Sequence, residues 1–419
     1  MENREEIAFK HIISNLAFKF SKVLNMKIGY FLSKFPYKNP FTGEIIGTVQ
    51  KDGGVENVSL NLAVEMSKRG HEIFIFTSAI DSHSSIESYD HIKIYRYARS
   101  FTIGSAPISL SSLYKPLFLD LPLDIVHVHL GNLPLPLIGY FYSKIKNKPL
   151  ITTYHGDYMG GFGSLVRRFG VYLFDNFIAD MLLNGSSIVL TPSEHYINES
   201  KHLHKINNNV IPISNGINLK YFDLNISKAE ARKKLNLSSS IQVILFVGSL
   251  TPRKAPDILL KAMVDILQKV PNAYLIFIGD GMMRKDLESL ARNLNIDQNI
   301  KFTGFISDDL KLLYYKASDL FVLPSLLESF GIVLLEASAV GLPLVVSNLE
   351  AFNTIVKDGY NGFFTKKGDQ KDLGEKIVYI LQNKDLRIKM SKNAKENSNN
   401  YSWTRVADET EKIYLNLTV

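Results

Sequence analysis

Short apolar runs alternate with amphipathic stretches along most of the chain, and this alternation is the feature that most restricts the fold. Several runs are continuously apolar, as strands buried on both faces of a sheet are. Strands that alternate with helices favour a parallel sheet with right-handed crossovers. The expected strands are residues 26–32, 72–77, 92–96, 125–129, 150–154, 187–190, 210–213, 242–247, 273–278, 300–302, 320–323 and 344–346. The clearest helices are residues 55–69, 255–269, 283–293 and 332–340.

The strands form two successive series, which predicts two α/β domains in a chain of 419 residues. The break is placed in residues 211–222, where Asn215-Gly216 signals a turn. We expect an extension at 1–25, a first domain at 26–212, a second at 213–400 and a final helical segment at 401–419. The polar residues 393–400 are expected to form a loop. Ligands of doubly wound sheets bind at the carboxyl ends of the strands.

Composition excludes several classes of protein. The chain has no cysteine, which rules out a disulfide scaffold, a thiolate metal site and a cysteine nucleophile. No apolar run reaches the roughly 18 to 20 residues of a membrane-spanning helix. The net charge of +7 is spread along the chain, which argues against a nucleic-acid groove. The acidic start is unlike a secretory signal, so we expect a cytoplasmic protein.

The strongest chemical signal is a strand, loop, glycine and helix at residues 323–337. Glu328 lies in the loop, Gly331 opens the helix, and Glu336 follows within an apolar run. A helix start can bind an anion. An ionised acid among apolar residues needs a partner, and ribose hydroxyls would supply one. Eight helical residues span about 12 Å, so the two acids could hold a ribose and a group beyond a diphosphate. The alternative is that both acids are simply solvated.

A second signal follows the strand expected at 242–247. Gly248 ends this strand, Arg253 and Lys254 lie in the next loop, and Pro256 is well placed to start a helix. Two cations at the carboxyl end of a strand suit a diphosphate leaving group, whose charge grows in the transition state. The alternative is a solvated surface pair, which is the usual role of adjacent Arg and Lys.

The first half carries weaker signals. Gly53-Gly54 precedes a helix and would let the backbone approach a ligand, although such a pair is often only a turn and matches no phosphate-binding motif. His155 ends an expected strand and so lies at the ligand-binding edge. His127 and His129 are two apart in a strand and share a face. No third metal ligand is evident beside them, and we interpret this pair as structural.

These motifs together resemble those of the retaining glycosyltransferases of family 4, also called group 1. The resemblance covers about residues 26–415, and Glu328 and Glu336 with Ser-Phe-Gly-Ile-Val between them are its most specific part. Further matches are Thr191-Pro-Ser, Asn215-Gly-Ile, Phe302-Thr-Gly-Phe and Tyr401-Ser-Trp. The family has the GT-B fold. The resemblance therefore implies two facing Rossmann-like domains of doubly wound parallel sheet with a cleft between them, and a last helix that crosses back to the first domain.

The resemblance also implies roles for the matching residues. Arg253 and Lys254 would hold the nucleotide diphosphate, Glu336 the ribose, and Glu328 the transferred sugar, with His155 near that sugar. The implied donor-binding set is Gly53, Gly54, Gly248, Arg253, Lys254, Glu328, Phe330, Gly331, Ile332 and Glu336, and the catalytic set is His155, Arg253, Lys254 and Glu328. Family members retain the anomeric configuration. A donor phosphate oxygen is thought to take the acceptor's proton, so no metal or cofactor is expected.

The implied reaction moves a hexose, as mannose from GDP-mannose or glucose from UDP-glucose, to a hydroxyl of a glycan, glycolipid or lipid-linked oligosaccharide. One alternative is a GT-B sugar-nucleotide epimerase or hydrolase, which would lack the two-glutamate signature. Another is a non-catalytic sugar-nucleotide-binding protein, against which the intact Glu328, Glu336, Arg253 and Lys254 argue.

Two segments depart from the common family pattern. Residues 7–24 form an apolar stripe at helical spacing whose only charged residues are lysines, which fits an anchor on anionic lipid. Alternatively this helix packs on the first domain, or Met26 is the true start. Residues 157–168 combine glycines, apolar residues and two arginines, which suits a lipid-linked phosphate acceptor; the alternative is an ordinary loop and helix. The anchor would place the enzyme on the inner face of the membrane.

Overall fold

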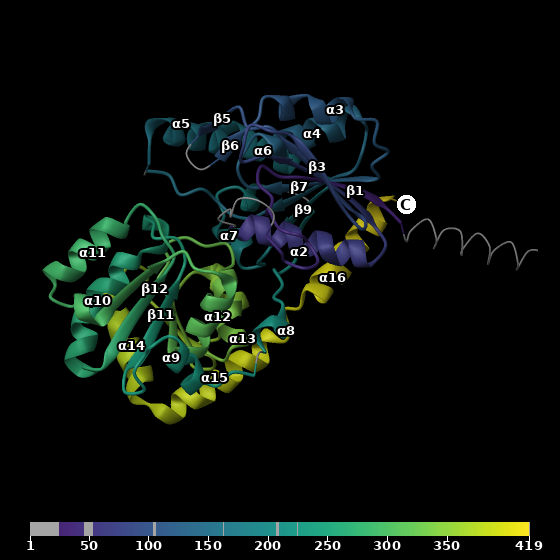
Figure 1. Ribbon diagram of the computed structural model, residues 1–419. Coiled ribbons are helices and arrows are strands. Elements are labelled where there is room, and N and C mark those ends of the chain that lie inside the picture. The colour runs from purple at the N-terminus through teal and green to yellow at the C-terminus, as the bar shows by residue number, and fades with distance from the viewer. Residues whose placement is uncertain are drawn as a thin grey trace, which may run out of the picture. The chain divides into compact units, whose positions relative to one another are not determined.

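The computed structural model describes residues 25–45, 53–103, 106–161, 163–206, 209–223 and 225–418. The chain divides into two compact units, and many of their elements are labelled in Figure 1. The first unit consists of Met1–Pro192, Lys201–Ile213 and Trp403–Val419, and the second of Ser193–Ser200 and Ser214–Ser402. The expected amphipathic helix at 7–24 lies outside the described residues.

The first unit is built on a sheet of eight strands in the order β10-β9-β8-β7-β1-β2-β4-β3. All neighbouring strands are parallel except β3, which runs antiparallel to β4. The strands are β1 (Lys27–Phe31), β2 (Glu72–Ser78), β3 (Ser85–Tyr89), β4 (Ile92–Tyr97), β7 (Ile125–Leu130), β8 (Leu150–Tyr154), β9 (Ile188–Thr191) and β10 (Val210–Pro212). The strand order reverses between β1 and β7, which makes this the switch point of a doubly wound sheet.

Helices and a small hairpin complete the first unit. The longer helices are α2 (Gly54–Lys68), α4 (Leu135–Ile145), α5 (Leu165–Leu173) and α16 (Trp403–Thr418). The shorter elements are β5 (Phe101–Ile103), β6 (Ala106–Ile108), η1 (Ser111–Leu113), α3 (Lys115–Phe118), η2 (Phe174–Ile178), α6 (Ala179–Asn184) and η3 (Leu203–Lys205).

The second unit is built on a six-stranded, wholly parallel sheet in the order β13-β12-β11-β14-β15-β16. Its strands are β11 (Gln242–Val247), β12 (Ala273–Ile278), β13 (Ile300–Gly304), β14 (Leu320–Leu323), β15 (Leu344–Ser347) and β16 (Gly362–Thr365). The order again reverses once, between β11 and β14, so the carboxyl ends of these two strands are where a ligand is expected.

The helices of the second unit connect these strands. The longer ones are α10 (Pro256–Lys269), α11 (Arg284–Asn293), α12 (Asp308–Ala317), α13 (Ile332–Ala339), α14 (Gln370–Gln382) and α15 (Lys384–Ser398). The shorter ones are α7 (Tyr196–Glu199), α8 (Leu219–Phe222), α9 (Lys228–Lys234), η4 (Pro252–Lys254), η5 (Asp297–Asn299) and η6 (Glu350–Thr354). Pro256 is the first residue of α10, as predicted.

The prediction of a loop at residues 393–400 is wrong, because α15 continues to Ser398. Two of its asparagines hydrogen-bond to the rest of the second unit. The side-chain amides of Asn393 and Asn397 donate to the carbonyl oxygens of Tyr360 (2.8 Å) and Ile355 (3.0 Å). The sequence also gave no signal for β3, whose side chains are mostly exposed and so lack an apolar run.

The domain boundary predicted after residue 212 also needs correction for residues 193–200. These residues were expected in the first domain but belong to the second unit. Ser193 and Thr354 share a hydrogen bond between their hydroxyl oxygens (2.7 Å), and α7 packs against η6. A short polar segment of this kind has no local pattern that indicates which core it will join.

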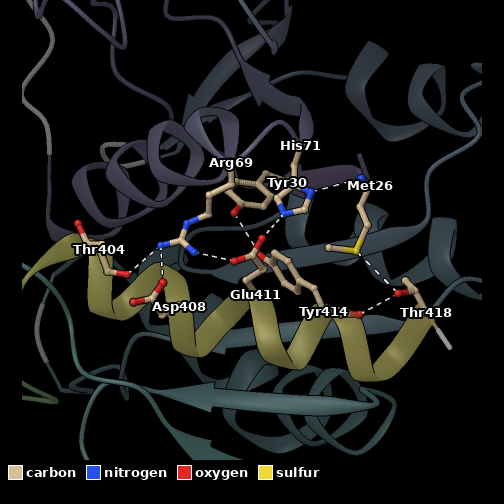
Figure 2. A network of polar contacts seen from close by, with 9 residues as sticks. All are labelled: Met26, Tyr30, Arg69, His71, Thr404, Asp408, Glu411, Tyr414 and Thr418. Atoms are coloured by element: carbon tan, nitrogen blue, oxygen red, sulfur yellow. Dashed lines mark hydrogen bonds and ion pairs between the residues drawn. The ribbon is translucent and has the colours of Figure 1, made fainter. Parts of the chain in front are cut away.

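The last helix, α16, is held on the first unit by the network drawn in Figure 2. Arg69, just after α2, donates to Glu411 (2.6 Å) and Asp408 (2.7 Å). The buried His71 accepts from the Met26 amide at Nδ1 (3.3 Å) and lies 2.9 Å from Glu411 through Nε2. Because the amide can only donate, the His71 ring proton lies on Nε2 and is donated to Glu411. Glu411 therefore joins α16 to two parts of the unit.

Replacing Glu411 with alanine is expected to lower the free energy of unfolding by about 1.5–3 kcal/mol, since it removes charge-assisted bonds to Arg69 and His71. Chemical denaturation measures the loss. Glu409→Ala is the matched control on the same helix, because Glu409 pairs with the exposed Arg405 in a contact worth little. Equal effects of the two substitutions would contradict an anchoring role for Glu411.

Candidate functional site

Two loops of the second unit bring the predicted cations and one predicted acid together. Arg253 and Lys254 follow β11, and Glu328 follows β14, so they lie at the strands that flank the switch point. Lys254 Nζ forms an ion pair with Glu328 Oε1, and Arg253 Nη1 lies 3.5 Å from Glu328 Oε2. The Leu326 amide also donates to the Arg253 carbonyl oxygen (2.8 Å), which joins the two loops through the backbone.

Two members of this cluster, Glu328 and Lys254, are buried, whereas Arg253 is partly exposed. Glu328 is 6% exposed and Lys254 is 8% exposed. Burial alone would raise the pKa of Glu328, but Arg253 and Lys254 outweigh it and hold that pKa below its ordinary value. Burial lowers the pKa of Lys254, and Glu328 opposes this shift. With Glu328 ionised and both cations charged, the cluster has one positive charge in excess, which suits an anionic ligand.

The start of α13 lies on the same loop as Glu328. Gly331 caps the helix with a φ of +84°, and a side chain there would place its Cβ 2.9 Å from Phe352 Cε1. Glycine is therefore required both by the left-handed backbone and by the space. Phe330 is buried, and Ile332 begins the helix, so the predicted helix start at Gly331 is confirmed. Such a start can present backbone N–H groups to an anion.

Glu336 has partners that the sequence argument did not foresee. Its Oε1 lies 3.1 Å from Lys311 Nζ, and its Oε2 accepts from the Tyr315 hydroxyl (2.8 Å). Both partners come from α12. Lys311 and Tyr315 therefore supply the partners that Glu336 needs without a ligand. The argument that Glu336 must bind ribose hydroxyls because it lacks a partner no longer holds. The expected separation of about 12 Å between Glu328 and Glu336 assumed that both lie on one helix. That assumption is wrong, because α13 begins only at Ile332 and Glu328 lies in the loop before it.

Sequence reasoning also missed the glycines that support the loop after β11. A Cβ on Gly279 would lie 2.1 Å from the Gly248 carbonyl oxygen, and one on Gly281 would lie 2.4 Å from that of Leu250. The Leu250 amide donates to the Asp280 carbonyl oxygen (3.0 Å). These close backbone contacts hold the loop that carries Arg253 and Lys254 against the loop after β12. The sequence signal that could have identified them is Gly279-Asp280-Gly281, which directly follows the apolar run that forms β12.

In the first unit, Gly53 and Gly54 lie at the start of α2, as predicted. Gly53 caps the helix, Gly54 is its first residue, and both are exposed. The Glu56 carboxylate accepts from the Gly53 amide at 3.1 Å. An acid therefore already occupies part of this helix start, so an anion binding there would have to compete with Glu56.

His155 lies directly after β8, at the carboxyl edge of the first sheet. Its Nε2 lies 3.3 Å from Nδ1 of the fully buried His129, and the two rings stack at 5.5 Å. His127 and His129 stack at 4.5 Å, so they share a face as predicted. Burial lowers the pKa of His155 to about 4 and that of His127 to about 3, so both rings are neutral at pH 7.

The segment that follows His155 is held by hydrogen bonds at Asp157 and is exposed further along, at α5. Asp157 is buried and accepts from the Tyr154 hydroxyl (2.6 Å) and the Lys201 amide (2.9 Å). Further along, Ser164 caps α5, in which none of the described side chains is buried. Phe162 lies outside the described residues. This segment is therefore anchored at Asp157 and presents α5 at the surface.

A three-residue metal site and a membrane-spanning helix are both absent from the described ranges. Within them, no group of three His, Cys, Asp or Glu residues is arranged to hold a metal ion. Asp308 and Asp309 begin α12, and Asp308 pairs with Lys311 (3.1 Å). No described helix is long and apolar enough to cross a membrane.

Comparison with known proteins identifies the family. The profile of glycosyl transferases group 1 matches residues 227–397, and that of glycosyltransferase family 4 matches residues 52–221. The α-monoglucosyldiacylglycerol synthase of Streptococcus pneumoniae is 30% identical over 327 residues, which cover 73% of this chain and 70% of that protein. The chain belongs to the group 1, family 4 glycosyltransferases. The first matched range holds the cations and both acids, and the second holds Gly53, Gly54 and His155.

Solved structures of glycosyltransferases have the same fold. Sucrose-phosphate synthase from Thermosynechococcus elongatus superposes with a TM-score of 0.75 at 20% identity, covering 94% of this chain and 99% of that one. Anabaena Alr3699/HepE, solved with UDP and glucose, gives a TM-score of 0.72 at 20% identity and covers 93% and 99%. The two Rossmann-like sheets of this family 4 glycosyltransferase are those of the GT-B fold, which confirms the predicted fold class.

Proposed function

We propose that this glycosyltransferase transfers a hexose from a nucleotide sugar, with retention of configuration and without a metal, to a hydroxyl of a glycan or lipid acceptor. The observation that carries the proposal is the cluster of the buried Lys254 and Glu328 with the partly exposed Arg253 at the switch point of the second sheet. Its excess positive charge suits a diphosphate. Its acid suits sugar hydroxyls, since a carboxylate can only accept hydrogen bonds.

The donor and acceptor classes are supported by related proteins. The structure of Alr3699/HepE contains UDP and glucose, and the name of the pneumococcal relative describes a glucosylated diacylglycerol. On this basis we propose UDP-glucose as the first donor to test and GDP-mannose as the second. Glu336 would hold the ribose in both cases by sharing its carboxylate between Lys311, Tyr315 and the ribose hydroxyls.

A thermal-shift screen tests donor binding. A nucleotide diphosphate at about 100 times its dissociation constant should stabilise the protein by about 2.7 kcal/mol. UDP, GDP and their hexose conjugates are compared with UMP and GMP, which lack the second phosphate. If Arg253 and Lys254 hold the diphosphate, the monophosphates should raise the melting temperature much less. No shift with any nucleotide diphosphate would contradict the proposed function.

We further propose that the enzyme works at an anionic membrane surface. Residues 7–24 supply the basic amphipathic stretch, and α5 with η2 supplies exposed apolar side chains: Leu165 is 79% exposed, Phe169 61% and Phe177 62%. Arg167 and Arg168 lie among them. Apolar side chains interleaved with cations suit the boundary between lipid headgroups and acyl chains.

Sedimentation with anionic and neutral vesicles tests this placement. The full chain should bind anionic vesicles, more weakly as salt rises, and a protein shortened to begin at Asn25 should bind much less. Keeping Asn25 preserves the buried hydrogen bond that the Met26 backbone amide donates to His71. Equal binding by both proteins would assign the contact to α5, and Phe169→Ser should then abolish it. Failure of the full chain to bind anionic vesicles would contradict the membrane proposal.

A further inference from the structure

Three histidines of the first unit form a stacked column that starts from the last helix. His127 Nδ1 lies 2.5 Å from the Tyr414 hydroxyl of α16, which in turn lies 3.1 Å from the Tyr30 hydroxyl. His127 Nε2 lies 2.7 Å from the Thr153 hydroxyl. Both ring nitrogens of His127 are therefore engaged by hydroxyl groups, which fixes the plane of its ring. His129 stacks on this fixed ring, and His155 stacks on His129.

The hydrogen bonding of His129, the middle histidine, determines which ring nitrogen of His155 carries the proton. His129 is fully buried, and its Nε2 has no hydrogen-bond partner. A buried N–H without an acceptor is rarer in proteins than a buried acceptor without a donor. The single ring proton of neutral His129 therefore belongs on Nδ1, which faces His155 Nε2 at 3.3 Å. His129 donates and His155 Nε2 accepts, so the one proton of a neutral His155 lies on its Nδ1.

We propose that His129, supported by His127 and Tyr414, is a positioning residue that fixes His155 as the neutral Nδ1–H tautomer. In this form the Nε2 lone pair is used by His129, and the ring can only donate, through Nδ1, to an oxygen. The proposal rests on the proposed function in assigning His155 to the transferred sugar. There it makes His155 a hydrogen-bond donor to a sugar oxygen, and it excludes His155 as the base that takes the acceptor's proton.

Long-range proton–nitrogen NMR correlation on the ¹⁵N-histidine-labelled full chain tests the tautomer without any ligand. The His155 signals are those lost in His155→Gln. At pH 7 the wild-type ring should show a protonated Nδ1 and an unprotonated Nε2. In His129→Phe, which keeps an aromatic ring but removes the donor, His155 should shift towards the Nε2–H tautomer. Tyr30→Phe keeps the ring that lies edge-on to His127 and His129 and removes only the hydroxyl that meets Tyr414, so it should leave the His155 signals unchanged.

Either of two results would overturn the proposal: a wild-type His155 with its proton on Nε2, or His155 signals that His129→Phe does not alter. The wild-type spectrum decides even if His129→Phe fails to fold. Turnover of UDP-glucose or GDP-mannose tests the link to function, since His129→Phe should lower kcat about tenfold with KM nearly unchanged. If the tautomer is as expected but His155→Gln keeps full turnover, the assigned role of His155 is wrong and the positioning role of His129 stands.

Discussion

Replacing Lys254 with alanine should lower turnover about 100-fold or more, because the side chain is proposed to neutralise charge that grows on the leaving diphosphate. The structure adds a second consequence. Lys254 also pairs with the buried Glu328, and removing one partner of a buried ion pair costs about 3–5 kcal/mol of stability. Steady-state kinetics and chemical denaturation of the same preparation measure the two losses separately.

A double variant tests whether the stability is lost because Glu328 is left without its partner. In Lys254→Ala with Glu328→Gln, no uncompensated charge remains buried, so most of the lost stability should return while turnover stays low. Arg253→Ala should lower turnover similarly with a smaller loss of stability, since Arg253 is more exposed and lies farther from Glu328. Recovery of turnover in the double variant would show that Lys254 acts only by supporting the fold.

The same assay tests the proposed independence of metal. If the cations neutralise the leaving group unaided, turnover should be unchanged by EDTA. Complete loss with EDTA and recovery with a divalent metal would overturn that part of the mechanism and leave the donor assignment in place.

Glu328→Gln and Glu336→Gln should affect binding of the bare nucleotide diphosphate differently. Glu336→Gln weakens the bond to the ribose, worth about 1.5–3 kcal/mol, so affinity should fall about tenfold to 100-fold. Glu328→Gln removes the acid that pairs with Arg253 and Lys254, so affinity for UDP or GDP should stay equal or rise while turnover falls.

Titration calorimetry with UDP and GDP distinguishes the two acids. Folding should persist in Glu336→Gln, because Lys311 keeps its contact with Asp308 at 3.1 Å. Glutamine preserves side-chain size in both variants, so a change in affinity reports the lost charge. If Glu328→Gln loses nucleotide affinity and Glu336→Gln does not, the roles of the two acids are inverted.

The sequence by itself determined the parts of the protein that depend on local pattern. Apolar runs gave the buried strands, and Gly331 and Pro256 marked helix starts, because burial and backbone geometry act on neighbouring residues. Placing Arg253, Lys254 and Glu328 after strands was enough to select them as ligand-binding candidates. The polar end of α15 and the exposed strand β3 escaped prediction, because neither carries an apolar period.

Only the tertiary structure decided which of these residues meet. The sheet order places β14 beside β11, and this brings Glu328 to Lys254 across a long stretch of chain. Packing of α12 supplies Lys311 and Tyr315 to Glu336, an acid that the sequence left without a partner. Parallel pairing of β7 with β8 stacks His129 on His155. Local periodicity shows whether a side chain is buried, whereas strand order and helix packing determine its neighbours, and the neighbours set its charge, protonation and chemistry.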